Sequence, residues 1–383
     1  MATYVPPHKR HSCGKSLIPE LQSPRSTNKP PRSTYSGIIF NDQECIYKWL
    51  CVGCGEFGQL PPGVHLQPFP YYDLERINGK EPEFLVNNNF RKDERTTSDH
   101  TLESPWSSVA KQVLDDLRIS IENLRNKADV SKPALVARFG KILFLNSKKH
   151  KVMSRLKEED LSSMKRIFYT NITPSYVDNV INEVIPKSGF EFVIEKDIYH
   201  VKLSDETRPG ATVTCKCIAT KDGAMKLYKV ELNQVRHMTT DISCLEKDLD
   251  LRIMLSTKKI LNDLAEDEEG MIREVISCGV VDPTVKGGIR WRMGRPGGGR
   301  FSVVGVWHIS SKKFKSSSLG MKVRHADRYD NRRDIGEVTD EVTIKMKELL
   351  LDLQENAEDE FIPQRLDHMF NFVWENLLSS PNV

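Results

Sequence analysis

The fold is decided by residues 190–204, which read FEFVIEKDIYHVKLS. Apolar and polar side chains alternate in two runs of this stretch, Phe190 to Ile194 and Ile198 to Lys202. Alternation with period two predicts β-strands, and the polar triplet Glu195 to Asp197 between the runs predicts a short turn. Similar runs at 213–217 and 227–231, joined by a turn at 221–223, extend this pattern to an antiparallel meander.

Further strands are predicted on both sides of the meander. Alternating residues predict strands at 249–255, 301–309 and 321–328, with a helix beginning near Ser256, and the apolar run 137–144 predicts a buried strand. Helical spacing predicts helices at 104–126, 157–168 and 174–186 and two acidic helices at about 337–356 and 362–379. Strands grouped between helices indicate an α+β fold with an antiparallel-rich sheet flanked by helices.

The composition divides the chain into three parts. Residues 1–36 are basic, rich in Pro and Ser and poor in large apolar side chains, which predicts a disordered basic tail. Residues 37–100 alternate short apolar runs with Gly and Pro clusters and predict a loop-rich, strand-containing arm. Residues 101–383 are expected to form the α+β globular domain, which ends in the acidic helices.

The charge is unevenly distributed along the chain. The 383 residues carry a net charge of +3, with 28% charged residues and a mean hydropathy of −0.46, which argues against a membrane-spanning protein and against wholesale disorder. Residues 282–333 alone sum to +10, whereas residues 334–383 sum to −9. Such segregation is the electrostatic pattern expected of a protein that meets polyanions, or of a basic face with its own acidic counter-charge.

The eight cysteines do not form a regular disulfide framework, so a reducing compartment is expected. The chain begins without an apolar signal segment, which favours a cytoplasmic or nuclear location, with organellar import as the weaker alternative. Cys51 and Cys54 form a CxxC pair, but no second pair with zinc-ligand spacing accompanies them. We therefore expect ordinary thiols, no metal ligand and no cofactor.

The segment 286–333 is the most informative for function. Arginines and lysines alternate there with glycines and aromatic residues, a mixture that suits single-stranded nucleic acid because guanidinium groups pair with phosphates and aromatic rings stack on bases. The alternation of Phe301, Val303, Gly305 and Trp307 places Trp307 in the core. The predicted nucleic-acid-binding residues are Lys286, Arg290, Trp291, Arg292, Arg295, Arg300, Lys312, Lys313 and Lys315.

No set of residues predicts catalysis, so the sequence favours a binding protein over an enzyme, and no catalytic residue is assigned. A phosphohydrolase that works inside a tunnel of antiparallel strands would explain basic residues on such a sheet. Its metal chemistry, however, requires strands that bear alternating glutamates, and Lys229 to Asn233 offers only Glu231.

Two segments resemble known proteins. Residues 4–10, YVPPHKR, are similar to a stretch near the N-termini of some DEAD-box RNA helicases and other mRNA-associated proteins, which implies partner docking by Tyr4, Val5, Pro6, Pro7 and His8. Nearly the whole chain resembles a family of plant proteins of unassigned function, through residues 4–11, 135–144, 199–204, 232–237, 282–291 and 303–308. This second resemblance implies one long domain and brings no catalytic residue.

Three functions follow in order of preference. The first is a non-enzymatic, RNA-associated protein that binds single strands through its basic, aromatic-bearing face. The second is a protein-interaction scaffold without a nucleic-acid role, in which the tail docks a partner protein and the acidic helices cover the basic strands. The third is a phosphate-processing enzyme. The expected partners are RNA and a protein that docks the tail, with no role for a membrane, and the oligomeric state is left open.

Overall fold

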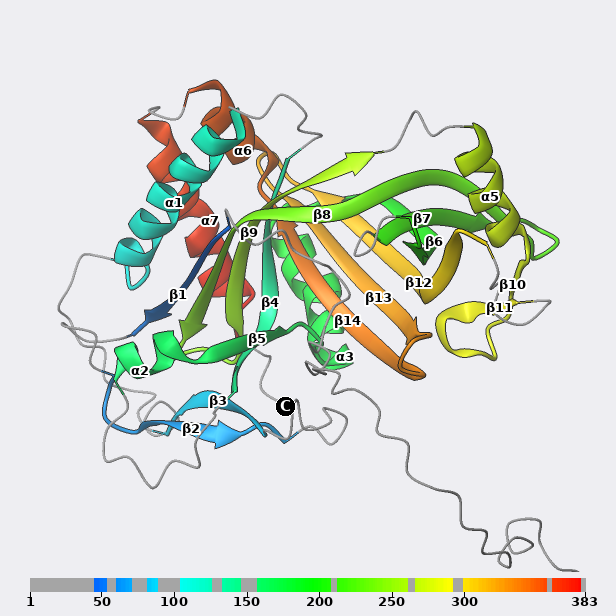
Figure 1. The fold of residues 1–383 in the computed structure, drawn as a ribbon. Helices are drawn as coiled ribbons and strands as arrows, with labels where there is room; N and C mark the ends of the chain where they lie inside the picture. Colours follow the sequence, from blue (N-terminus) through cyan, green and yellow to red (C-terminus); the bar gives the residue numbers. More distant parts are fainter. Residues whose placement is uncertain are drawn as a thin grey trace, which may run out of the picture. The chain divides into compact units, whose positions relative to one another are not determined.

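The computed structural model describes residues 45–53, 60–70, 81–88, 104–125, 133–145, 157–207, 212–260, 266–291, 299–356 and 360–379. They fold into a large, mostly antiparallel sheet with helices packed on it, which confirms the α+β class (Figure 1). The described residues belong to one compact unit, residues 36–383. No described helix has both the length and the apolar character needed to cross a membrane.

The chain alternates between long strands and short groups of helices. The strands are β1 (Ile46–Val52), β2 (Val64–Pro68), β3 (Pro82–Asn87), β4 (Ala134–Leu145), β5 (Lys165–Tyr169), β6 (Glu191–Asp205), β7 (Thr212–Ala219), β8 (Met225–Cys244), β9 (Asp250–Ile260), β10 (Gly279–Val281), β11 (Ile289–Trp291), β12 (Phe301–Lys315), β13 (Gly320–Asp330) and β14 (Ile335–Lys345). The helices are α1 (Ser107–Arg125), α2 (Glu158–Ser163), α3 (Pro174–Asn179), α4 (Ile185–Lys187), α5 (Glu266–Ser277), α6 (Lys347–Glu355) and α7 (Phe361–Asn376), with a π-helical turn η4 (Val180–Val184) and a 3-10 turn η5 (Lys286–Gly288).

Eight of the strands close into a ring. Strand β8 pairs with β7, β7 with β6, β6 with β12, β12 with β13, β13 with β14 and β14 with β4, and β9 joins β4 back to β8. All these pairs are antiparallel. Because a closed sheet has an inside and an outside, the alternating side chains of each strand divide between an inner and an outer face.

The outer face is apolar and carries the helices. Leu251 and Ile253 of β9 share one core cluster with residues of α1, α6 and α7, and Val201 of β6 shares another with residues of α5. In Figure 1, α1, α6 and α7 lie at one end of the sheet and α5 lies at the other. The two clusters that hold the helices therefore lie outside the ring, and a smaller cluster of Ile198, Ile309 and Ala326 lies inside it.

The sheet extends beyond the ring on one side. Strand β1 pairs in parallel with β8, and the second half of β4 leaves the ring to pair with β5 and β3, which also carries β2. The predicted arm thus supplies strands β1, β2 and β3. The predicted tail, residues 1–36, and its docking residues Tyr4, Val5, Pro6, Pro7 and His8 lie outside the described residues.

Helix prediction at the C-terminal end is correct in part. Helices α6 and α7 are present, but residues 337–345 belong to strand β14 and not to the first acidic helix. The helices pack with α1 and β4, and they share a core cluster with Phe314, Met321 and Val323 at one end of β12 and β13. Ile289 belongs instead to the cluster that contains residues of α5.

Three other boundaries differ from the predictions. The polar triplet Glu195 to Asp197 is not a turn, because β6 runs straight through it beside Lys312 and Ser310 of β12. Residues from Ser256 continue β9 to Ile260, and the helix begins only at Glu266. Residues 165–168 form β5, whereas α3 begins as predicted at Pro174 after an N-cap at Thr173.

Candidate functional site

The inner face of the ring is defined by which residues stand directly opposite one another. Residues paired across neighbouring strands project on the same side of a sheet. Trp307 of β12 stands between His200 of β6 and Arg328 of β13, and Ser311 stands opposite Arg324. Further along, one row continues through Lys313 of β12, Lys322 of β13, Thr343 of β14, Arg138 of β4, Arg252 of β9 and Asp241 of β8.

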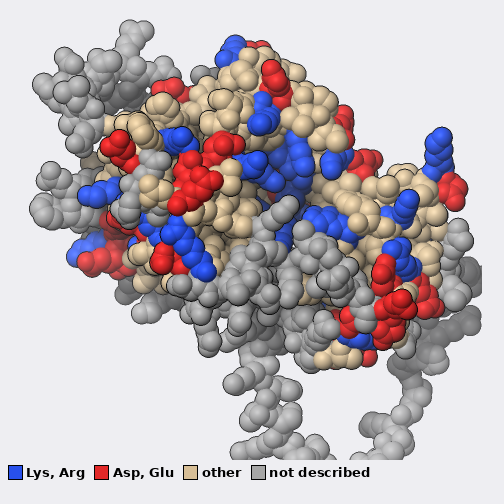
Figure 2. Space-filling view, turned by 90° about the horizontal axis from the view of Figure 1, so that it is seen from above, with Lys and Arg blue, Asp and Glu red and all other residues tan. Residues whose placement is uncertain are grey.

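The inner face is predominantly basic. Its cations, named here the inner cations, are Arg138, Lys202, Lys216, Lys229, Arg236, Arg252, Lys258, Lys313, Lys322, Arg324, Arg328 and Lys345. Carboxylates that contact them are Glu231, Asp241 and Glu341. Figure 2 shows Lys and Arg side chains gathered at the centre of the face seen from above. Cations therefore outnumber carboxylates inside the ring.

Cations from opposite walls of the ring influence one another. Burial, together with the charges of Arg324, Lys313, Lys345 and Lys216, lowers the pKa of Lys322 to about 7. Lys216 lies on β7, and three strands separate β7 from β14, which carries Lys345. Since the field of Lys216 also lowers the pKa of Lys345, the inner cations converge on one shared space.

Glu231 neutralises one group of inner cations. Its carboxylate lies 2.7 Å from Nζ of Lys216, 2.8 Å from Nζ of Lys229 and 3.7 Å from Nζ of Lys258. Burial raises the pKa of Glu231, but hydrogen bonds from Lys216 and Lys229 outweigh it and bring the pKa to about 2. The Lys258 side chain nevertheless remains 46% exposed, so solvent reaches this part of the inner face.

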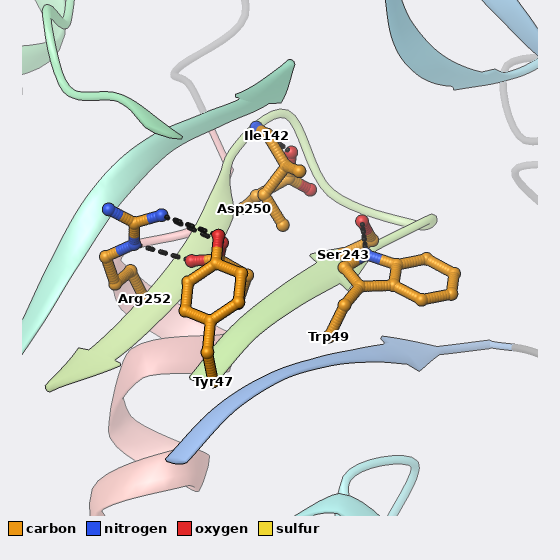
Figure 3. Close-up of polar contacts among 7 residues, drawn as sticks. Tyr47, Trp49, Ile142, Ser243, Asp250 and Arg252 are labelled. Carbon is orange, nitrogen blue, oxygen red and sulfur yellow. Dashed lines mark hydrogen bonds and ion pairs between the residues drawn. The ribbon is translucent and has the colours of Figure 1, made fainter. Parts of the chain in front are cut away.

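Glu341 and Asp241 neutralise three arginines. Arg324 and Arg328 both donate to the carboxylate of Glu341. Arg252 donates to both oxygens of Asp241, at 2.5 and 2.8 Å, and Tyr47 of β1 donates to the same carboxylate at 2.7 Å (Figure 3). Burial raises the pKa of Tyr47 to about 12, so it remains a donor. These carboxylates are thus held by their cationic or phenolic partners.

Several inner cations have no such partner among the described residues. No carboxylate of the described residues forms an ion pair with Arg138, Lys313, Lys322 or Lys345. Lys313, Lys322 and Arg138 belong to a single row across β12, β13, β14 and β4, with Thr343 between the last two cations. We name Lys313, Lys322, Thr343 and Arg138 the cationic row.

Within this row, Arg138 is the residue whose burial costs the most free energy. Burial lowers its pKa to about 10, and the neighbouring charge of Arg252 acts in the same direction. Its Nε donates to no acceptor, and the buried hydroxyls of Ser311 and Thr339 on the inner face also have no partner within the described structure. A buried guanidinium without a counter-charge is costly in free energy, so an acceptor placed at these donors would stabilise the fold.

Trp307 and His200 complete the inner face. A bulge between Val303 and Gly305 reverses the alternation along β12, so Trp307 projects to the inner face and packs there against a small buried cluster of Ile198, Ile309 and Ala326. Lys202 Nζ lies 3.8 Å and Arg328 Cζ 5.0 Å from the centre of the indole ring. Burial and nearby cations lower the pKa of His200 to about 2, so its imidazole is neutral.

The predicted nucleic-acid-binding residues fall into separate groups. Lys313 belongs to the cationic row, whereas Lys312 on the same strand stands opposite Val323 and projects outward. Lys315 is exposed at the end of β12. Arg300 is held by two hydrogen bonds of 3.0 Å to the buried Asp205 and by an ion pair with Glu268. Its guanidinium is therefore already neutralised.

Of the remaining predicted residues, Lys286, Arg290 and Trp291 lie in or next to η5. Arg290 forms an ion pair of 2.7 Å with Asp282, and Arg292 and Arg295 lie outside the described residues. Lys286 and Trp291 line a pocket of about 390 Å³ on the outer side of β12 and β13, together with Tyr329. The structure thus brings Lys286 and Trp291 together and separates them from Lys313.

Glycines 287 and 288 have a structural role in η5. Both have positive φ, 76° and 72°, and a side chain on Gly287 would meet Tyr329 and Val306 at 3.0–3.3 Å. The amide of Gly287 donates to Asp327 at 3.0 Å. These glycines fit η5 against the sheet and leave no space there for a nucleic-acid backbone.

Neither cysteine motif forms a metal centre in the described part of the chain. Cys51 packs beside a small core cluster, and Cys54 lies outside the described residues. Cys215 and Cys217 are buried on the outer, apolar face of β7. Among the described residues, no three His, Cys, Asp or Glu side chains are grouped to hold a metal ion.

Sequence reasoning identified Lys313 and missed the rest of the cationic row. Arg138 stands in a strand that was predicted, and the alternation of β13 places Lys322 and Arg324 on the face opposite Met321 and Val323. That alternation was a usable signal. The closure of the ring, which makes the polar face an interior, was not predictable from any single strand.

Comparison with known proteins identifies the family. The chain belongs to the family described as "Domain of unknown function (DUF7903)", whose sequence profile matches residues 33–377. No curated protein matches the chain.

Solved structures resemble the chain only at low similarity. The RNA triphosphatase Pct1 of S. pombe is 12% identical, with a TM-score of 0.48 over 76% of this chain and 99% of that one. A putative adenylate cyclase of Bacillus halodurans is 8% identical, with a TM-score of 0.25 over 56% of this chain and 89% of that one.

Proposed function

We propose that this member of the DUF7903 family binds the phosphate groups of a polyanion inside its closed sheet. The observation that carries the proposal is the cationic row, in which Lys313 and Lys322 stand directly opposite each other and Arg138 is buried without a counter-charge. Like charges directly opposite on a sheet destabilise it. A ligand with several negative charges would remove that cost.

The chemistry of the inner face suits phosphate. Lysine and arginine are the standard donors to phosphate oxygens, and charge-assisted hydrogen bonds are stronger than neutral ones. The unpartnered Arg138 Nε and the hydroxyl of Ser311 supply further donors. Burial keeps the pKa of Lys202 near 8 and that of Lys322 near 7, so a bound anion would favour their protonated forms and draw protons from solution.

Calorimetric titration with inorganic tripolyphosphate tests this function. We expect saturable binding to the full-length chain that weakens steeply with salt, because each phosphate contact replaces a counterion. Lys322→Gln is expected to weaken binding by about tenfold or more, which corresponds to the loss of one charge-assisted contact. Absence of binding, or full affinity in Lys322→Gln, would contradict the proposal.

Single-stranded RNA contact is the second candidate function. It is supported by the pocket that Lys286 and Trp291 line, where an exposed ammonium lies beside an aromatic ring. Trp291→Leu together with Lys286→Gln is expected to weaken binding of an RNA oligonucleotide and to leave tripolyphosphate binding unchanged. The reverse pattern is expected for Lys322→Gln. If neither the Trp291→Leu, Lys286→Gln double variant nor Lys322→Gln changes the affinity for RNA, neither the pocket nor the inner face is the RNA contact site.

Phosphate processing is a further step beyond binding. Glu231, Asp241 and Glu341 are the inner carboxylates that contact the inner cations, and each is already bonded to basic side chains or to Tyr47, whereas Glu337 and Asp330 stand near the start of β14 and at the end of β13. We therefore propose binding without turnover. Release of orthophosphate from tripolyphosphate at a rate that depends on Glu231 or Glu341 would replace this proposal by an enzymatic one.

A further inference from the structure

We infer that the inner face takes its phosphate ligand as the free anion and not as a magnesium complex. This inference rests on the proposed function and concerns the chemical form of the ligand. Phosphate chains in magnesium-containing solution are carried largely as Mg²⁺ complexes, and proteins that bind such complexes usually offer one or two carboxylates to the metal. The question is therefore whether the inner face offers a carboxylate oxygen that can bind Mg²⁺.

The oxygens of Glu231 are engaged by three ammonium groups. Lys216, Lys229 and Lys258 surround this carboxylate at 2.7, 2.8 and 3.7 Å. A metal ion at Glu231 would have to displace them and would leave three further cations without a counter-charge. Glu231 is thus an internal counter-ion that a phosphate chain can replace.

The carboxylate of Glu341, on another strand, is likewise engaged by basic side chains. Arg324 and Arg328 both donate to it, and Thr170 also donates to Oε1 at 3.3 Å. Strands β9 and β4 separate β14, which carries Glu341, from β8, which carries Glu231. The two carboxylates come from separate strands and each is enclosed by its own cations, so they do not present a common pair of oxygens to one metal ion.

The unneutralised charges favour the free anion as well. Lys313, Lys322, Lys345 and Arg138 would repel a divalent cation and would attract the full charge of an uncomplexed phosphate chain. The neutral donors of the inner face, the hydroxyls of Ser311, Thr339 and Thr343, add hydrogen bonds without adding a metal ligand.

The test is a titration of the full-length chain with tripolyphosphate, once in EDTA and once with magnesium in excess over the phosphate. We expect the affinity to fall by about tenfold or more in magnesium, because the complexed ligand carries less negative charge. Higher affinity in magnesium would overturn the inference and leave the proposed function intact. No binding under either condition would instead reject the proposed function itself.

Glu231→Gln separates the two roles of that carboxylate. A counter-ion role predicts that this variant binds tripolyphosphate in EDTA as tightly as the parent chain or more tightly, because Lys216, Lys229 and Lys258 become available. A metal-ligand role predicts weaker binding that magnesium no longer improves. If this variant does not fold, Glu341→Gln makes the same distinction, and the magnesium dependence of the parent chain decides alone if neither folds.

Discussion

At the scale of single residues, the structure separates cations that stabilise the fold from cations that cost stability. Lys322 is of the second kind, because it stands opposite Lys313 and is repelled by the charges of Arg324, Lys345 and Lys216. We predict that Lys322→Gln raises the free energy of unfolding by about 0.5 kcal/mol at pH 7 while it weakens phosphate binding. Urea unfolding measures the first effect. A less stable variant would show that Lys322 serves the fold.

Arg300 is of the first kind. It neutralises the buried Asp205 and lowers the pKa of that carboxyl. Arg300→Gln would leave Asp205 without its partner, so we predict a lower free energy of unfolding, measured by urea unfolding at pH 7. The carboxyl is expected to recover a higher pKa, and the deficit should shrink as the pH falls and Asp205 is protonated. Unchanged stability of the Arg300→Gln variant would contradict a stabilising role of Arg300.

The lowered pKa values also predict how stability depends on pH. Lys322 has a pKa of about 7, and Lys202 and Lys258 have pKa values of about 8, whereas an unfolded lysine has about 10.4. The unfolded chain therefore binds more protons between about pH 7 and 10, and this contribution to stability rises with pH in that window. Tripolyphosphate binding should weaken over the same window. Urea unfolding and calorimetry at pH 7, 8.5 and 9.5 test both trends.

At the scale of elements, the polar inner face explains which predictions succeeded. Runs with one apolar face, such as β7 and β9, were found because their outer residues alternate regularly. Strand β14 was taken for a helix because its buried positions include Thr339 and Glu341, which resemble solvent-facing residues. The bulge in β12 likewise reversed the expected position of Trp307. Hydropathy alone cannot show that a polar face is enclosed.

Strand β4 changes partners at Gly140, and this point is sensitive to substitution. Its first half pairs with β9 and β14 and its second half with β5, and a side chain at Gly140 would collide with the carbonyl of Tyr169. We predict that Gly140→Ala destabilises the fold by about 2 kcal/mol, as overpacking does elsewhere. Thermal and urea unfolding measure the change. A neutral substitution would mean that β5 can move away without cost.

At the scale of the whole molecule, the arrangement exchanges the usual places of apolar and polar residues. The helices cover the outer face, and the core clusters lie between helices and sheet. The interior of the ring holds many charged side chains beside one small apolar cluster, and such a number of buried charges is not required to hold the helices. The α+β class followed from the pattern of strands and helices, but the site depends on ring closure, which joins residues as distant as Arg138 and Lys322.

Two lysines adjacent in sequence test the central claim most directly. Lys313 belongs to the cationic row inside the ring, and Lys312 projects from the outer face of the same strand. The decisive measurement is the dissociation constant of tripolyphosphate for Lys313→Gln and Lys312→Gln, determined side by side in EDTA. We predict that Lys313→Gln weakens binding by about tenfold and that Lys312→Gln leaves it unchanged. Equal effects of the two substitutions would place the phosphate site outside the closed sheet and contradict the account.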